Sequence, residues 1–358
     1  MKTKNVFIII TPLQLINAIE YKEQYLKEST NTNILFVINY LEKTKEQIKQ
    51  VLEFSQWDEV HFVFNHSVTY SSRIKGVLYH LLFSFYEKTA FNRINNILVN
   101  QKPDFIAIGN YYNRICYKLL QKHNYSNAIV LDDGMNSMSI TSIRGNEINQ
   151  GKNHFLLKKF TPKKKIELGL MGIGNRPIER SITFYSSFIK AVDNNDRLVI
   201  NGFHFFSSLF ERKRKGDFVY FIGSPFVELG IISQTTYFRF LDNIKNYYSE
   251  PVIYIAHRLE RDYNLEKIKT ILSVKRLVNP IEIELIKLDI LPGKLASFYS
   301  AALITISKIF SNRIEVNSFL LPFEEVNKIS KEMFIDVYST IQDFQGDNFK
   351  LIDILIKK

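Results

Sequence analysis

The sequence of 358 residues has little cysteine and no long apolar run. Its single cysteine, Cys116, excludes an internal disulfide and any cysteine-rich metal site. No stretch approaches the roughly 20 apolar residues that a membrane-spanning helix needs. The first apolar run, residues 6–10, is too short for a signal peptide and is followed by no small-residue cleavage site. These absences predict a cytoplasmic protein.

Several motifs of common enzyme classes are also missing. The sequence has no Gly-x-Gly-x-x-Gly and no Walker motif, which argues against dehydrogenases and P-loop kinases, and it has no Gly-x-Ser-x-Gly elbow. The seven histidines form no His-x-x-x-His pair. The adjacent acids Asp132 and Asp133 lack the Asp-x-Asp spacing of many metal-dependent glycosyltransferases. We therefore expect no metal site and no cofactor.

Basic residues exceed acidic ones, with 47 Lys and Arg against 36 Asp and Glu and a formal net charge of +11. Much of the excess lies in two clusters, residues 158–165 and residues 212–215. Neither cluster has the interleaved aromatics of a single-strand binder, so we expect no nucleic-acid partner. A solvated basic surface is the simpler interpretation. Peripheral contact with anionic lipid at the cytoplasmic face of the inner membrane is the alternative.

Short β-branched runs alternate with amphipathic stretches, which is typical of βαβ units. In the first part of the chain this pattern predicts five strands, at residues 6–10, 33–38, 59–64, 104–108 and 128–131. Alternation resumes further on, with strands predicted at residues 218–222, 252–255, 284–288 and 303–306. We therefore expect an α/β protein with two doubly wound, Rossmann-like domains.

The predicted organisation has four parts. An N-terminal Rossmann-like domain covers residues 1–155, and residues 156–216 form a connecting region. A second α/β domain covers residues 217–330, and a helical tail at 331–358 is expected to return to the first domain. Open α/β sheets bind ligands at the carboxyl ends of their strands, so the cleft between the domains is the expected site.

Two adjacent acids, Asp132 and Asp133, follow the fifth predicted strand and precede Gly134. This placement puts carboxylates at the mouth of the sheet, where one of the pair is a candidate general base. An ordinary turn with a helix N-cap is the alternative, because Asp and Gly favour such positions.

Other polar residues follow predicted strands of the first domain. Thr11 and Gln14 come after the first strand, and Gly109 and Asn110 come after the fourth. Because parallel strands end at the same edge of a sheet, we expect these residues to line a sugar or acceptor site.

In the second domain, His257 and Arg258 follow the strand at 252–255, where an imidazole and a guanidinium can both donate to a phosphate. Gly223 and Ser224 form a tight turn with N–H donors after the strand at 218–222. A lone histidine is also common as a structural or surface residue, and that interpretation remains open.

The segment around Ser300 and Ala301 is a third candidate in this domain, because small hydroxyl residues can open a helix whose N–H groups bind phosphate. Glu282, which precedes it, offers a carboxylate for ribose hydroxyls. A serine that only caps or lines a packed helix is the alternative.

Taken together, these residues resemble the motifs of the bacterial sialyltransferases. Those proteins share an acidic D/E-D/E-G motif, a His-Pro motif and a later serine motif. The counterparts here, in the same order, are residues 132–134, residues 256–258 and residues 298–302. Residues 223–229 and 11–14 look most like glycosyltransferase family 52 and the related capsule and lipooligosaccharide sialyltransferases.

The resemblance implies a GT-B-type fold, in which two Rossmann-like domains face each other across a cleft. It also implies an inverting, metal-independent transfer of sialic acid from CMP-sialic acid to a glycan hydroxyl, in lipooligosaccharide or capsule synthesis. Asp133, in preference to Asp132, would deprotonate the acceptor hydroxyl. His257 would stabilise or protonate the leaving phosphate.

The remaining roles that the resemblance implies belong to donor binding. Ser300 and the Ala301 N–H would bind the phosphate, Glu282 the ribose, and Gly223 with Ser224 the nucleotide. The sequence departs from the family pattern twice. Arg258 replaces the proline and adds a cation, and Ala301 stands where a second serine often occurs.

Three other functions remain as alternatives. The first is a GT-B transferase that uses another nucleotide sugar. The second is a non-enzymatic protein of surface-polysaccharide assembly that binds a membrane surface through residues 158–165. The third is a nucleic-acid binder, whose binding would depend strongly on salt.

Overall fold

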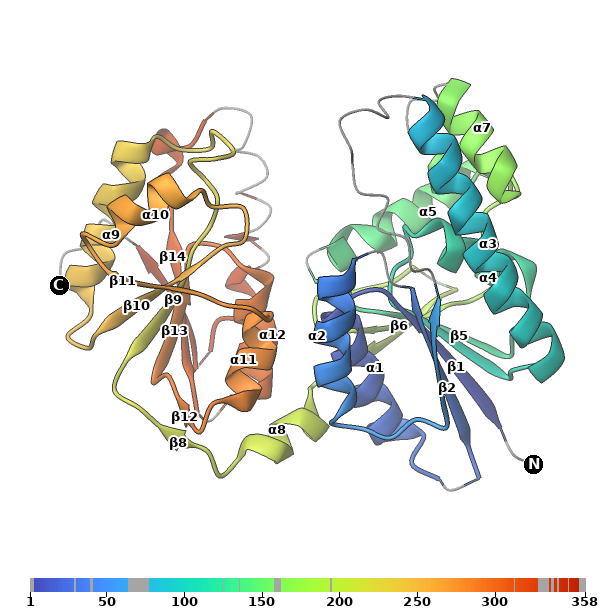
Figure 1. Cartoon of the computed structure of the whole chain (residues 1–358), viewed down its shortest axis with the longest axis horizontal. Helices are drawn as coiled ribbons and strands as arrows, with labels where there is room; N and C mark the ends of the chain where they lie inside the picture. Colours follow the sequence, from blue (N-terminus) through green and yellow to red (C-terminus); the bar gives the residue numbers. More distant parts are fainter. Residues whose placement is uncertain are drawn as a thin grey trace. The chain divides into compact units, whose positions relative to one another are not determined.

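The computed structural model divides the chain into two compact units, Met1–Asn201 and Gly202–Lys358 (Figure 1). Each unit is built around its own parallel sheet. The structure describes residues 3–28, 30–38, 41–63, 77–123, 125–134, 136–157, 162–193, 195–311, 313–327, 335, 338–339, 341–346 and 348–353.

The first unit contains a seven-stranded sheet in the order β3-β2-β1-β4-β5-β6-β7, and every neighbouring pair is parallel. The strands are β1 (Lys4–Ile9), β2 (Thr32–Ile38), β3 (Glu59–Val63), β4 (Phe105–Ile108), β5 (Asn127–Leu131), β6 (Thr183–Ser186) and β7 (Arg197–Ile200). The helices are α1 (Pro12–Tyr25), α2 (Glu42–Leu52), α3 (Val77–Gln101), α4 (Arg114–Lys122), α5 (Ile140–Gln150), α6 (His154–Leu157) and α7 (Pro162–Met171), with a 3₁₀ turn, η1 (Asn136–Ser139).

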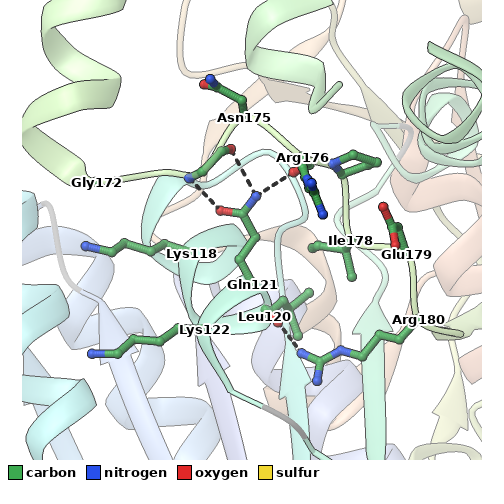
Figure 2. Close-up of a pocket in the computed structure, with 12 residues that line it drawn as sticks. Lys118, Leu120, Gln121, Lys122, Gly172, Asn175, Arg176, Ile178, Glu179 and Arg180 are labelled. Carbon is green, nitrogen blue, oxygen red and sulfur yellow. Dashed lines mark hydrogen bonds between the residues drawn. The ribbon is translucent and has the colours of Figure 1, made fainter. Parts of the chain in front are cut away.

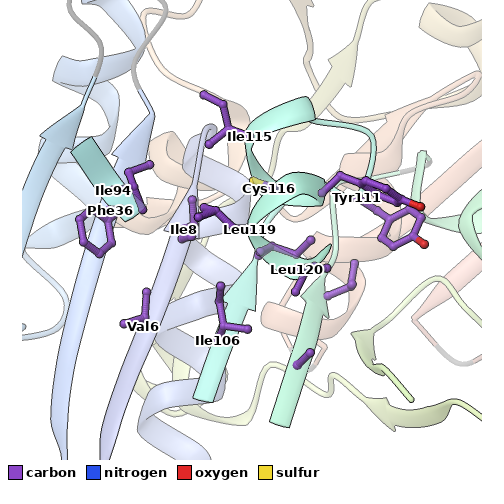
Figure 3. Close-up of a cluster of buried hydrophobic side chains, with 14 of the residues drawn as sticks. Val6, Ile8, Phe36, Ile94, Ile106, Tyr111, Ile115, Cys116, Leu119 and Leu120 are labelled. Atoms are coloured by element: carbon purple, nitrogen blue, oxygen red, sulfur yellow. The ribbon is translucent and has the colours of Figure 1, made fainter. Parts of the chain in front are cut away.

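The central strands β1, β2 and β4 are buried along nearly their whole length, as expected for a parallel sheet covered on both faces. Val6, Ile8 and Ile106 project from these strands into one core cluster, which Leu119 of α4 and Ile94 of α3 also enter (Figure 3). All five predicted strands of this unit are present in the structure.

Two further strands lie in the region that the sequence analysis assigned to a connection. β6 and β7 extend the first sheet beyond β5. Each has only four residues, too few to show a clear period in the sequence. β6 is nevertheless well buried, because Phe184 and Tyr185 are fully buried within it.

The second unit contains a six-stranded parallel sheet in the order β11-β10-β9-β13-β14-β15, beside a two-stranded ladder of β8 and β12. The strands are β8 (Arg214–Lys215), β9 (Val219–Ile222), β10 (Val252–Ala256), β11 (Ser273–Arg276), β12 (Ile290–Leu291), β13 (Lys294–Ser297), β14 (Glu315–Leu320) and β15 (Phe349–Asp353). The helices are α8 (His204–Phe210), α9 (Gln234–Tyr247), α10 (Asp262–Ile268), α11 (Ile281–Lys287) and α12 (Ala301–Ile309), with a 3₁₀ turn, η2 (Phe323–Glu325).

Two strand predictions in this unit are wrong. Residues 284–288 were predicted as a strand but lie largely in α11, and residues 303–306 lie in α12. Short apolar runs do not distinguish a strand from a buried helix. In α12, Ser300 decides the outcome, because its side chain caps the helix by accepting the Ala302 N–H at 3.3 Å.

The predicted helical tail is also wrong in part. Residues 349–353 form β15, which pairs in parallel with β14 at the edge of the second sheet. These residues belong to the second unit rather than the first. Parts of residues 331–348 lie outside the described residues.

The basic clusters fall in different surroundings. Residues 158–161 of the first lie outside the described part of the chain. In the second, Arg212, Arg214 and Lys215 are exposed, whereas Lys213 donates from Nζ to the Leu288 carbonyl at 2.5 Å, at the end of α11. None of the described helices is long and apolar enough to cross a membrane.

Candidate functional site

The strand order of the first sheet reverses between β1 and β4, because the chain continues from β1 to β2 on one side and returns to β4 on the other. Ligands of open α/β sheets bind at the carboxyl ends of the strands beside such a reversal. Thr11 and Gln14 follow β1, Gly109 and Asn110 follow β4, and Asp133 follows β5. The five predicted residues therefore lie at this edge of the sheet.

The Asp133 carboxylate is the centre of this group. Gln14 Nε2 donates to Oδ1 at 2.6 Å, and Asn110 Nδ2 donates to Oδ2 at 2.6 Å. The Asp133 backbone N–H donates to Ser137 Oγ at 2.8 Å, which fixes the turn beneath the side chain. Asp133 is partly exposed. Two amides from opposite sides of the strand reversal thus orient one solvent-accessible carboxylate.

The orientation of both amides is set by the backbone. Gln14 Oε1 accepts the N–H groups of Ile10 at 2.7 Å and Thr11 at 3.3 Å, and Asn110 Oδ1 accepts the Tyr112 N–H at 2.8 Å. Since each amide oxygen already faces a donor, each amide NH₂ must point toward Asp133.

The start of α1 explains why Gln14 reaches this position. Thr11 and Gln14 form a capping box, with Thr11 Oγ1 accepting the Gln14 N–H at 3.3 Å, and Pro12 occupies the first turn. Thr11 therefore acts as the helix cap. Its side chain serves the site through Gln14.

Gly109 leaves the space that Gln14 occupies. A Cβ at this position would lie 2.3 Å from Gln14 Oε1 and 2.6 Å from its Cδ. Any larger residue must displace the Gln14 side chain, and with it one of the two donors to Asp133.

We expect Gly109→Ala to lower the free energy of unfolding of the first unit by about 1–3 kcal/mol, because the added methyl group overpacks the Gln14 side chain. Urea unfolding followed by the fluorescence of Trp57, the single tryptophan of the chain, measures this. Gly169→Ala in α7 is the matched control, since a Cβ there meets no described atom within 4 Å. A Gly109→Ala variant as stable as this control would contradict the packing argument.

Asp132 has a different environment from its neighbour. It is 1% exposed, and its Oδ2 accepts the Ser187 N–H at 2.6 Å and the Ser187 hydroxyl at 3.0 Å. The Ser186 hydroxyl donates to Oδ1. Burial raises the pKa of Asp132 to about 6, against the opposing effect of these hydrogen bonds. Asp132 therefore fastens the end of β6 to the end of β5 and is too enclosed to meet a substrate hydroxyl.

The raised pKa predicts a pH dependence of stability. The pKa of Asp132 rises from its ordinary value of 3.8, which applies in the unfolded chain, to about 6 in the native state. The native state therefore holds the proton more tightly, and the contribution of Asp132 to stability is lost as pH rises through about 6. A shift of this size corresponds to about 3 kcal/mol. We expect the difference in unfolding free energy between the native protein and Asp132→Asn to decrease by about this amount from pH 4 to pH 7. Trp57 fluorescence in urea titrations measures it, and a difference independent of pH would rule out the assignment.

Sequence reasoning did not find the serines that support the two aspartates. Ser137 holds the turn at Asp133, and Ser186 with Ser187 holds Asp132. The only signal was the pair of serines directly after the aromatic residues of β6, in a region assigned to a connection.

The second sheet has a corresponding reversal of strand order between β9 and β13. Gly223 and Ser224 follow β9, and His257 and Arg258 follow the neighbouring β10. Ser300 comes shortly after the end of β13. Except for Glu282 in α11, the structure therefore brings the predicted donor-binding residues to one edge of three adjacent strands.

The His257 ring is held in one tautomer. Its Nδ1 accepts the Leu259 N–H at 3.2 Å, so the proton of the neutral ring lies on Nε2. Burial, together with the exposed Arg258 guanidinium, lowers the pKa of His257 below its usual value. At neutral pH this side chain is therefore a neutral hydrogen-bond donor.

A buried carboxylate, Glu260, connects the loops after β9 and β10. Its Oε2 accepts the His257 N–H at 2.6 Å, and the Tyr254 hydroxyl donates to Oε1. Tyr254 in turn contacts the Tyr237 hydroxyl at 2.7 Å, which accepts the Ser224 N–H at 3.2 Å. Burial raises the pKa of Glu260 to about 7.

Gly223 is required beside this chain of hydrogen bonds. A Cβ on Gly223 would lie 2.3 Å from the Tyr254 hydroxyl and 2.7 Å from Glu260 Oε2. The glycine that looked like a simple turn residue in the sequence therefore allows a close approach of the β9 loop to the β10 loop.

The other residues predicted to bind the sugar-nucleotide donor lie at the starts of helices. Ser300 caps α12, and Ala301 is its first residue. Glu282 lies in the first turn of α11 and is 7% exposed, and burial raises its pKa. Among the described residues no other side chain donates to the Glu282 carboxylate. No cluster of three or more His, Cys, Asp or Glu in the described part of the chain could hold a metal ion.

No protein-family model and no curated protein sequence matches the chain. Solved structures do resemble it. Phytolacca americana UGT2, in complex with UDP-2-fluoro-glucose and pterostilbene, aligns with a TM-score of 0.51 at 10% identity over 95% of this chain and 84% of its own. The spinosyn forosaminyltransferase SpnP aligns with a TM-score of 0.50 at 10% identity over 99% and 86%. Arabidopsis thaliana UGT89C1, in complex with UDP-L-rhamnose, aligns with a TM-score of 0.50 at 9% identity over 99% and 86%. The chain thus has the two-sheet α/β architecture of the GT-B glycosyltransferases.

Proposed function

We propose that this protein is an inverting glycosyltransferase that transfers sialic acid from CMP-sialic acid to a glycan hydroxyl without a metal ion. The observation that carries the proposal is the Asp133 carboxylate, oriented by Gln14 and Asn110 at the strand reversal of the first sheet. The GT-B fold and the motif resemblance to sialyltransferases support it.

In the proposed reaction, Asp133 accepts the proton of the acceptor hydroxyl. The hydroxyl oxygen then forms a bond to the anomeric carbon of the sialic acid, and the bond from that carbon to the phosphate oxygen breaks. The electron pair of the broken bond stays on the CMP phosphate. A fixed carboxylate suits this task because it needs no reorganisation as the proton moves.

The second unit would bind the donor. His257 presents a neutral Nε2–H donor, and Arg258 adds a positive charge beside it. Ser300 and the first N–H groups of α12 would hold the phosphate, since helix N-termini favour anions. The buried Glu282 carboxylate would accept hydrogen bonds from ribose hydroxyls, which would compensate for its burial. Such donors can meet the charge of the leaving phosphate in place of a metal.

Asp133→Asn tests the proposed base. The amide keeps the size of the side chain but cannot accept the proton, so we expect kcat to fall roughly 10²-fold or more. Asp242→Asn on the exposed face of α9 is the matched control and should keep full activity. CMP release and product mass are the measurements. Undiminished transfer by Asp133→Asn would contradict the role of Asp133 as the base, and absence of transfer by the unaltered protein would instead favour a non-enzymatic role in polysaccharide assembly.

A donor screen tests the substrate class. The protein is incubated with EDTA, a panel of small galactosides and either CMP-sialic acid or UDP-sugars. We expect transfer from CMP-sialic acid alone, because the motifs resemble those of sialyltransferases. We expect the transfer to persist in EDTA, because the proposed site meets the phosphate charge with protein groups.

A GT-B transferase that uses a UDP-sugar is the second candidate, favoured by the UDP-sugars bound in two of the structural neighbours. Turnover of a UDP-sugar with none of CMP-sialic acid would replace the first proposal by this one.

A further inference from the structure

The first unit contains an open cavity of about 700 Å³ between the end of α4 and the loop of residues 172–180 (Figure 2). α4 starts just after the carboxyl end of β4 and ends shortly before the amino end of β5, and the loop leads into the amino end of β6. The cavity therefore lies toward the amino edge of the sheet, away from the edge that carries Asp133.

Four cations line this cavity. Lys118 and Lys122 project from α4, and Arg176 and Arg180 come from the loop, whereas Glu179 is the single acidic residue of the lining (Figure 2). None of the four cations forms an ion pair with a carboxylate within the described ranges. Burial and the neighbouring Lys122 and Lys88 lower the pKa of Lys118, as expected where positive charges crowd together.

The cavity is held open by contacts between the helix and the loop. Gln121 Nε2 donates to the carbonyls of Gly174 at 3.1 Å and Arg176 at 2.7 Å, and its Oε1 accepts the Gly174 N–H at 3.1 Å. The Arg180 guanidinium donates to the Leu120 and His123 carbonyls, and Lys118 donates to the Met171 carbonyl. The loop is thus fixed before any ligand binds, which lowers the entropic cost of binding.

The alternative explanation of these cations is structural. Lys118 and Lys122 lie over the Phe91 ring, at 3.8 and 5.7 Å from its centroid. Arg180 lies over the Tyr125 ring at 5.5 Å. The α4 dipole adds a further interaction. The end of a helix carries a partial charge of about −0.5, and its effect does not extend beyond the last turn. The four cations and Glu179 together give the lining a net charge of +3, so the dipole balances only a small part of this charge. The Nε of Arg180 is also buried without a described hydrogen-bond partner.

We propose that this cavity binds a ligand carrying phosphate groups, at a site separate from the one built around Asp133. Arg and Lys side chains suit phosphate oxygens, and an excess of three positive charges suits a diphosphate or a pair of phosphate esters. Leu120, Pro177 and Ile178 give the lining an apolar part, which fits an organic group attached to the phosphate. The phosphate can come from a soluble phosphorylated molecule or from a lipid headgroup.

The test uses the full-length double variant Lys122→Gln/Arg176→Gln. Among the described residues, neither of these two side chains donates a hydrogen bond to the loop, whereas Lys118 and Arg180 donate to backbone carbonyls. The double variant should therefore keep the shape of the cavity. Arg212→Gln/Lys215→Gln in the second unit is the control, because it removes the same charge from an exposed surface. Trp57 fluorescence in urea verifies that the first unit of each variant remains folded.

One arm of the experiment measures pyrophosphate binding by calorimetry at low salt. The other measures co-sedimentation with vesicles of phosphatidylglycerol and phosphatidylcholine against vesicles of phosphatidylcholine alone. We expect saturable binding in at least one arm, weakened roughly tenfold or more in the cavity variant and little changed in the control.

Binding to pyrophosphate identifies a soluble ligand as the source of the phosphate, and binding only to the anionic vesicles identifies a lipid headgroup. Absence of binding in both arms overturns the proposal. Equal affinities of the cavity variant and the control variant also overturn it, since binding would then occur elsewhere. Neither result bears on the donor screen, because the cavity lies apart from the proposed transfer site.

Discussion

The convergence of parallel strands on one edge of the first sheet is the constraint on which the candidate site depends. Gln14 and Asn110 lie on either side of the reversal in strand order. Both donate to Asp133, which follows the next strand of the sheet, β5. Their positions rest on local chemistry. The Thr11 cap sets the start of α1, and Gly109 leaves room for Gln14. A change in any of these residues would therefore act on the same carboxylate.

The two adjacent aspartates at the end of β5 have different surroundings, one inside the fold and one at the candidate site. Successive side chains at the end of a strand point to opposite sides, so Asp132 turns into the sheet toward Ser186 and Ser187 while Asp133 faces Gln14 and Asn110. Burial of Asp132 opposes its ionisation, whereas its hydrogen bonds anchor the short β6 strand. The sequence motif named both acids as candidates, and only their surroundings separate them.

The parts of the fold that could be predicted are those in which one signal dominates. β1 and β2 are continuous apolar runs rich in β-branched residues, which is typical of a strand in a buried parallel sheet. Thr11 and Gln14, which follow β1, lie at the expected edge of that sheet. β6 and β7 were missed because four residues carry too little pattern. α12 was taken for a strand because its apolar sequence fits either structure, and the Ser300 cap decides between them. Glu260 was missed because nothing in the sequence shows that an acid three residues after His257 turns inward.

Glu260 also bears on how the second sheet could handle a phosphate. By accepting the His257 N–H and, through the two tyrosines, fixing the Ser224 N–H, it holds the loops after β9 and β10 together. The His257 ring is then kept neutral by burial and by Arg258, with its proton on Nε2. A neutral imidazole stabilises a leaving phosphate by donating a hydrogen bond and does not need to transfer its proton. Because a nucleotide phosphate is already a stable anion once its charge is met, hydrogen bonding is sufficient for its departure. Proton transfer in the proposed reaction would therefore fall to Asp133 alone.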